Sequence, residues 1–145
     1  MANTLYDFAR QRFLEAQINW MTDTVKVILV STSAYTPQTA LHQYLADIAV
    51  SARIAGPVTL TAKATTGGAA DAADCTFTSV SGATINAIVI YKDTGTEATS
   101  PLIAYIDTAT GLPITPNGGD IIVTWDEINS GINNLISLTV RPLAK

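Results

Sequence analysis

The feature that most constrains the fold is a series of short apolar segments separated by residues that favour turns. The separators include DTGTEATSP, TATGLPITPNGG and EINSG, and such Gly-, Pro-, Asn- and Ser-rich stretches interrupt regular structure. The segments are rich in β-branched residues and too short to be independent helices. About seven strands at this spacing predict an all-β sandwich or a jelly-roll-like domain. We expect them at residues 24–31, 58–63, 75–80, 83–92, 102–107, 120–126 and 134–141.

Two other segments have a helical pattern. Leu5, Phe8 and Phe13 belong to an apolar stripe at helical spacing, which predicts an N-terminal helix over residues 1–17, capped by Asn3 or Thr4. Residues 39–48 (TALHQYLADI) predict a short helix or turn. The chain of 145 residues has the length of one domain. We therefore expect a single domain over 1–145, with a β-rich body at 24–145.

Several of the expected strands are apolar on both faces. Val89 and Tyr91 point to one side of their strand, while Ile88 and Ile90 point to the other. A two-sheet sandwich usually leaves one polar face on each sheet. The second apolar face must therefore be covered by the N-terminal helix, by a loop or by another subunit. With only 14% charged residues, this pattern also predicts contacts between copies of the chain.

Composition excludes several classes of protein. With 48% hydrophobic residues and 14% charged ones, the chain is not intrinsically disordered. Its longest strictly apolar runs, such as Leu102–Ile106, fall far short of the ~20 residues of a spanning helix, so we expect no membrane partner. Charges near the start argue against a secretory signal. A net charge of −4 with scattered Lys and Arg argues against a nucleic-acid partner.

Residues with reactive or metal-binding chemistry are few and scattered. The chain has one Cys and one His, so it has neither an internal disulfide nor a zinc pattern. We interpret Cys75 as a small buried hydrophobe and His42 as a surface or half-buried side chain. Asp71 and Asp74 are the carboxylates least unsuited to calcium, although solvated loop charges are the commoner explanation. We expect no catalytic, cofactor-binding or metal-binding residue.

Particular strings in the sequence resemble a known class of protein. Residues 1–30 (MANTLYDFARQRFLEAQINWMTDTVKVILV), followed by AYTP and YLADI, are similar to the start of small virion structural proteins of tailed bacteriophages. Residues 88–126 (IVIYKDTGTEATSPLIAYIDTATGLPITPNGGDIIVTWD) resemble the same proteins, in the same order. The resemblance does not extend to residues 127–145.

The resemblance implies a non-enzymatic particle component present in many copies. It favours a capsid decoration (cement) protein, made in the host cytoplasm and bound at the capsid surface to the major capsid protein. A tail, neck or tail-fibre component is the alternative. A carbohydrate-binding module is a further one, and it would need an exposed aromatic platform for which the candidates are Trp20, Tyr35 and Trp125.

The N-terminal segment is the candidate assembly contact. We expect the middle of the predicted helix to cap its own sheet, while the residues before it touch a neighbouring molecule. The expected contact residues are Ala2, Asn3, Thr4, Leu5 and Tyr6.

Overall fold

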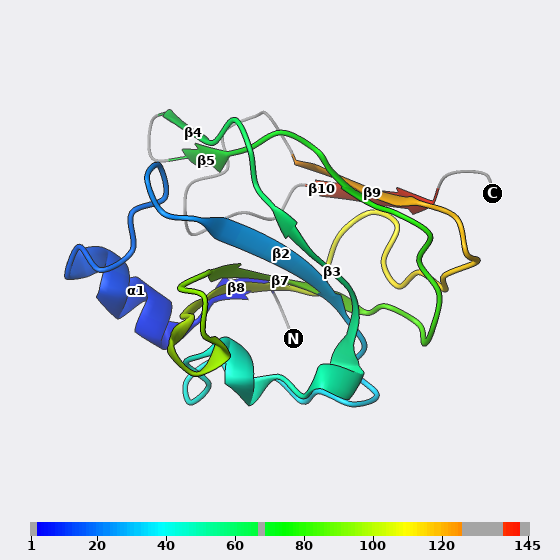
Figure 1. Ribbon diagram of the computed structural model, residues 1–145, viewed down its shortest axis with the longest axis horizontal. Coiled ribbons are helices and arrows are strands. Elements are labelled where there is room, and N and C mark those ends of the chain that lie inside the picture. Colours follow the sequence, from blue (N-terminus) through cyan, green and yellow to red (C-terminus); the bar gives the residue numbers. More distant parts are fainter. Residues whose placement is uncertain (1–2, 67–68, 126–137, 143–145) are drawn as a thin grey trace.

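Two antiparallel sheets form the body of the molecule. The structure is a computed structural model that describes residues 3–66, 69–125 and 138–142. The larger sheet has five strands in the order β1-β8-β7-β2-β3, and the smaller one has the order β10-β9-β6. The smaller sheet lies over one face of the larger sheet (Figure 1). This arrangement confirms the expected mainly β class.

The larger sheet is built from strands distant in sequence. Its strands are β1 (Thr4–Leu5), β8 (Leu102–Ile106), β7 (Ala87–Lys92), β2 (Val25–Val30) and β3 (Arg53–Thr59). All neighbouring pairs run antiparallel. The edges of this sheet are therefore β1 and β3.

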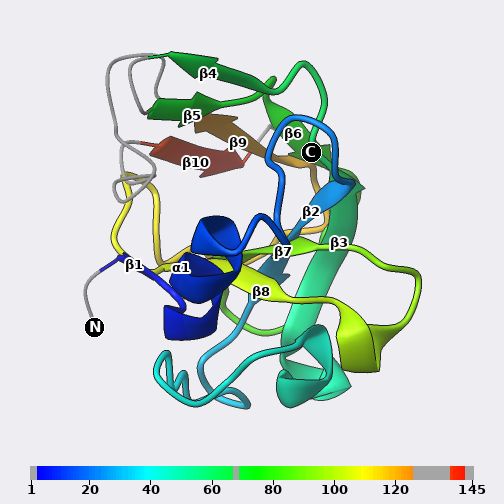
Figure 2. The same ribbon diagram turned by 90° about the vertical axis from the view of Figure 1, so that its left-hand side faces the viewer.

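The smaller sheet and a separate hairpin complete the strands. The smaller sheet contains β6 (Cys75–Phe77), β9 (Ile121–Trp125) and β10 (Leu138–Pro142). The hairpin pairs β4 (Ala64–Thr66) with β5 (Ala69–Asp71), and it lies beyond the smaller sheet (Figure 2). Gly67, Gly68 and the EINSG separator at residues 127–131 lie outside the described residues.

The apolar second face of the larger sheet is covered by the chain itself. Every residue of β8 is buried, and so is every residue of β7 except Lys92. Helix α1 (Asp7–Leu14) packs against β8, and the segment 31–52 lies on the face opposite the smaller sheet (Figure 1). Tyr35, Leu45 and Ile48 of that segment are core residues. The two-faced strands are therefore explained within one chain, and they no longer indicate a homo-oligomer.

The N-terminal helix is shorter than expected. Residues 4 and 5 form strand β1, and Tyr6 is still extended (φ −66°, ψ 144°), so the helix begins at Asp7. The capping role expected for Asn3 or Thr4 is wrong, because no side chain caps the helix. The edge of β8 needs hydrogen-bond partners for its backbone. Residues 4–5 pair with β8, and Leu5 and Tyr6 become buried. These two contributions stabilise the fold more than another half turn of helix would.

The expected short helix over 39–48 is a loop with a 3₁₀ turn at Leu45–Asp47, followed by a second one at Val50–Ala52. An Asp47 carboxylate oxygen accepts hydrogen bonds from the backbone N–H groups of Gln43 (2.7 Å) and Tyr44 (2.9 Å). Burial raises the pKa of Asp47, but these hydrogen bonds outweigh it and hold the pKa below its usual value. Asp47 thereby holds Tyr44 in an extended conformation where a helix would continue.

Strand β3 also lies earlier than expected, at Arg53–Thr59 rather than 58–63. Arg53 fixes its start: its guanidinium donates to the carbonyl oxygens of Leu45 and Ile48 and pairs with Glu97 at 3.0 Å. Beyond the end of the strand, Leu60 is buried and Thr61 is exposed, so buried and exposed residues still alternate there. Ala62 has φ +50°, outside the conformation of a strand. The apolar alternation therefore continues for one residue beyond the strand.

Candidate functional site

The N-terminal residues close one edge of the larger sheet. Strand β1 pairs with β8 through Thr4↔Tyr105 and Leu5↔Ala104, and Tyr6 N–H donates to the Ile103 carbonyl at 2.9 Å. Asn3 continues the closure with its side chain. Its Oδ1 accepts from the N–H groups of Asp107 (2.9 Å) and Thr108 (2.8 Å), and its Nδ2 donates to the Thr108 carbonyl.

This closure changes the interpretation of the expected assembly contact. Leu5 is 4% exposed and Tyr6 is 0% exposed, so their side chains belong to the core and are not available to another molecule. Asn3 and Thr4 are half-buried, and Ala2 lies outside the described residues. The prediction that residues through Tyr6 touch a neighbour is therefore wrong for Leu5 and Tyr6.

A chain of polar side chains runs from the core to the surface at Tyr6. Its hydroxyl lies 2.9 Å from that of Tyr35, which lies 2.9 Å from Nδ1 of the half-buried His42. Burial, and then the adjacent Tyr35, raise the pKa of Tyr6 above its usual value. The chain of contacts ties segment 31–52 to the N-terminal strand, which is a structural role for His42.

The other residues considered for chemistry have structural surroundings. Cys75 is buried in β6, and burial raises the pKa of its thiol to about 11. Such a thiol is protonated at neutral pH and is a poor nucleophile. Trp20, Tyr35 and Trp125 are each less than 10% exposed. They therefore cannot form the flat, exposed platform that a carbohydrate-binding module would need.

Several carboxylates in the described residues are paired with nearby groups. Asp93 forms an ion pair with Lys26 at 2.7 Å, and Asp120 accepts from the Ser79 N–H at 2.9 Å. Asp71, one of the two carboxylates considered for calcium, accepts from the N–H of Ala72. Within residues 3–66, 69–125 and 138–142, no three His, Cys, Asp or Glu side chains are placed to hold a metal ion.

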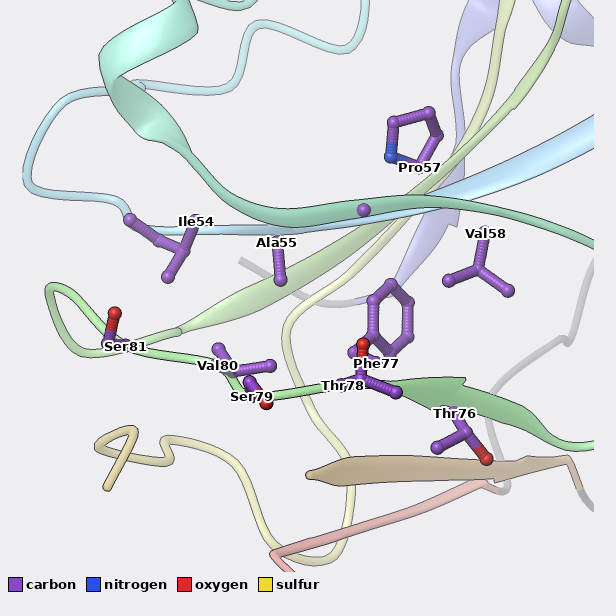
Figure 3. A pocket seen from close by; sticks show the side chains of 11 residues that line it. Ile54, Ala55, Pro57, Val58, Thr76, Phe77, Thr78, Ser79, Val80 and Ser81 are labelled. Atoms are coloured by element: carbon purple, nitrogen blue, oxygen red, sulfur yellow. The ribbon is translucent and has the colours of Figure 1, made fainter. Parts of the chain in front are cut away.

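The opposite edge of the larger sheet borders a groove. The groove lies between β3 and the segment that runs from β6 into the following turn, and it encloses about 350 Å³ (Figure 3). Phe77 and Val80 point from that segment toward Ala55 of β3. The lining residues are Ile54, Ala55, Gly56, Pro57, Val58, Thr76, Phe77, Thr78, Ser79, Val80 and Ser81.

At Gly56, the backbone of β3 lies very close to its neighbours in both sheets. Its φ is +97°, and a Cβ added there would lie 2.7 Å from the Val27 carbonyl oxygen and 3.1 Å from the Phe77 ring. Glycine therefore lets β3 approach both its neighbouring strand and the other sheet. The sequence offered little signal for this groove, because Gly56-Pro57 reads as an ordinary turn and Cys75–Phe77 as an ordinary short strand.

A second hollow of about 460 Å³ lies near the end of β8. Its polar groups include Asn86, whose Oδ1 accepts from the Thr32 N–H at 3.0 Å. It also contains Asp107, whose backbone N–H is already bonded to Asn3. The hollow thus adjoins the closed edge, and its polar groups serve to hold loops together. Its lining consists of Thr32, Thr36, Pro37, Asn86, Tyr105, Asp107 and Pro113.

Comparisons with known proteins assign the chain to no family. No protein-family model matches the chain, and no curated protein matches it. Among the described residues, no helix is long and apolar enough to span a bilayer. The groove beside β3 is therefore the candidate site that follows from the structure itself.

Proposed function

We propose that this chain is a structural protein of a tailed-bacteriophage virion, and that it is a capsid decoration protein bound to the major capsid protein at the capsid surface. The proposal rests on the resemblance of residues 1–30 and 88–126 to small virion structural proteins of tailed bacteriophages that the sequence analysis describes. These two segments contain β1, α1, β2, β8 and β9, and all of β7 except Ala87. The resemblance thus covers most of the larger sheet.

The physical properties of the fold support a protein that acts by binding. A decoration protein reacts with nothing: it needs a body that keeps its shape and a surface that is complementary to the shell. Strands β7 and β8 are buried on both faces within one chain, which favours a rigid body. Many copies, each making a modest contact, stabilise a shell collectively.

The position of the chain in the intact particle tests this proposal. Electron microscopy of the virion whose genome encodes this chain should show copies of the protein on the lattice of the head. Each copy should contact the major capsid protein. Density on the tail axis, in the neck or in a fibre would replace decoration with a tail role. Absence from the purified virion would overturn both.

We also propose contacts between copies of this chain, for which the remaining support is the low share of charged residues, 14%. They are tested by light scattering on the purified protein and by the spacing of copies on the shell. A protein that stays monomeric in solution, with copies on the head that do not touch, would contradict them while leaving decoration itself in place.

A further inference from the structure

The contacts of His42 fix the direction of the hydrogen bonds that join it to Tyr35 and Tyr6. The backbone N–H of Gln38 donates to Nδ1 of His42 at 3.3 Å, so Nδ1 carries no proton and the neutral ring has its hydrogen on Nε2. The Tyr35 hydroxyl, 2.9 Å from the same Nδ1, must then donate to it. Because this uses the single hydrogen of that hydroxyl, the Tyr35 oxygen accepts from the Tyr6 hydroxyl, 2.9 Å away. The chain therefore runs in one direction, from Tyr6 through Tyr35 to His42.

A proton on Nδ1 of His42 is incompatible with this chain of hydrogen bonds. A charged histidine carries a hydrogen on both ring nitrogens and accepts no hydrogen bond. If Tyr35 keeps its orientation, its hydroxyl faces another donor and the contact is lost. If the chain reverses instead, the Tyr6 hydroxyl has to donate elsewhere, yet Tyr6 is 0% exposed and its hydroxyl has no other partner among the described residues. Either outcome is unfavourable, because it leaves a donor unsatisfied.

The neighbouring tyrosines keep their protons over the range in which a histidine changes charge, about pH 5 to 8. Burial is the main cause that raises the pKa of Tyr6, Tyr35 and Tyr105 above the usual value. The Tyr105 ring packs against the Tyr35 ring from β8, with the ring centroids 6.4 Å apart. The tyrosines are therefore neutral hydrogen-bond donors throughout this range, and the change in charge falls on His42.

Charged side chains surround His42 on its own segment and on the elements packed against it. On its own segment, burial raises the pKa of Asp47, two backbone hydrogen bonds lower it, and the charge of His42 lowers it further. The Asp47 carboxylate is therefore charged above pH 5 and attracts a protonated His42 ring. On α1, Arg12 donates to the Tyr44 hydroxyl at 2.9 Å, so its positive charge lies on the same segment. The other charged groups on the packed elements include the ion pairs Asp7–Arg10 and Arg53–Glu97, and Asp107 after β8.

Tyr35 is the side chain that holds the loop formed by residues 33–38. It is the one buried residue of that loop. The two ends of the loop are tied separately, by hydrogen bonds to the N–H of Thr32 and to the carbonyl of Thr39. A weaker hold on Tyr35 therefore frees the loop between two fixed ends and leaves the strands in place.

We propose that His42 is a pH-sensitive latch: its neutral ring holds the loop 33–38 against the larger sheet through Tyr35, and a proton on Nδ1 loosens that loop. The latch is closed at pH 8 and opens as the pH falls toward 5. Thr36 and Pro37 of this loop line the hollow of about 460 Å³ near the end of β8, so opening the latch changes the shape of that hollow. This inference does not depend on whether the chain belongs to a phage head, a phage tail or neither.

Nuclear magnetic resonance of the full chain tests the latch, because His42 is the only histidine and gives a single set of ring signals. At pH 8, the ring nitrogen shifts should show the hydrogen on Nε2. The backbone order parameters of residues 33–38 should fall from about 0.85 at pH 8 to below about 0.6 at pH 5, with the midpoint of the His42 ring titration. The proposal is overturned if Nδ1 carries the hydrogen at pH 8, or if the loop is equally ordered at both pH values.

Two variants and a matched control complete the test. Tyr35→Phe keeps the ring but removes the hydroxyl, so the loop should have low order parameters at both pH values. His42→Gln keeps a neutral acceptor that does not titrate, so the loop should stay ordered at both. Tyr91→Phe, at a buried tyrosine of β7 outside this cluster, should keep the pH response of the unmodified protein. A loop that stays ordered in Tyr35→Phe, or a pH response that persists in His42→Gln, would overturn the proposal.

Discussion

The two edges of the larger sheet are finished in different ways. At the β8 edge, Asn3, strand β1 and Tyr6 satisfy the backbone and bury two apolar side chains. At the β3 edge, the backbone N–H and carbonyl of Thr59 point away from β2 beside an uncharged groove, because the neighbouring Leu60 directs its own toward β2. The N-terminus thus covers β8 on one side, where the two-residue strand β1 becomes the edge, whereas the longer strand β3 is the edge on the other side. The comparison shows that the N-terminal segment is part of the fold, and that the longer exposed edge, β3, lies across the sheet from it.

The largest expected effect comes from removing this cover. Tyr6→Ala should destabilise the protein by about 3–5 kcal/mol, as other large-to-small substitutions of buried aromatic residues do. Tyr6→Phe keeps the ring and loses only the hydrogen bond to Tyr35, so its cost should be about 0.5–1.5 kcal/mol. Urea unfolding followed by tryptophan fluorescence measures both. Unchanged stability of Tyr6→Ala would mean that Tyr6 contacts another molecule rather than its own core.

The next effect tests the packing of the β3 edge. Gly56→Ala should cost about 2–4 kcal/mol, because it combines an unfavourable φ with a clash against the Val27 carbonyl. Gly95→Ala is the matched control. Gly95 also has a positive φ (+90°), but an added Cβ would meet nothing within 4 Å. Its cost should be only the conformational part, about 1–2 kcal/mol. Equal losses for the two variants would show that β3 is not held close to its neighbours.

A smaller effect is expected from the side chain that extends the cover over β8. Asn3→Ala removes the acceptor for the N–H groups of Asp107 and Thr108 and should cost about 0.5–1.5 kcal/mol in thermal unfolding. Asn3→Asp keeps that acceptor and should recover part of the loss. If Asn3→Asp is no more stable than Asn3→Ala, the hydrogen bonds to residues 107 and 108 do not hold the edge.

The smallest effect concerns the middle of the sheet, away from both edges. The ion-paired hydrogen bond from Lys26, followed by the Gly95 N–H, holds the pKa of Asp93 below its usual value. A carboxylate whose pKa is lower in the folded state stabilises the fold above its unfolded pKa. That contribution is lost as the pH falls through the lower, folded pKa. Acid unfolding curves should therefore be shallower for Asp93→Asn, and an identical pH dependence would contradict the pair.

The sequence was sufficient to predict the fold class but not the edges. Strands β2, β7, β8 and β9 lie within segments that the sequence predicted as strands. Their β-branched and apolar side chains favour both the strand conformation and burial. Leu5 was also recognised as apolar, but its helical spacing with Phe8 and Phe13 hid the fact that β8 needed an edge partner. Pairing between residues about a hundred positions apart leaves no local signal. The groove was missed for the same reason, since β3 and residues 76–81 meet only in the folded chain.

Native-state hydrogen exchange compares the two edges directly, amide by amide. On the β8 edge, the N–H groups of Tyr6 and Asp107 are hydrogen-bonded and should be protected. On the β3 edge, the N–H of Thr59 should exchange at least a hundredfold faster than that of Leu60, its bonded neighbour. Protection of Thr59 equal to that of Leu60 in the isolated protein, or exchange of Tyr6 as fast as that of Thr59, would contradict a sheet in which β8 is covered and the β3 edge is exposed.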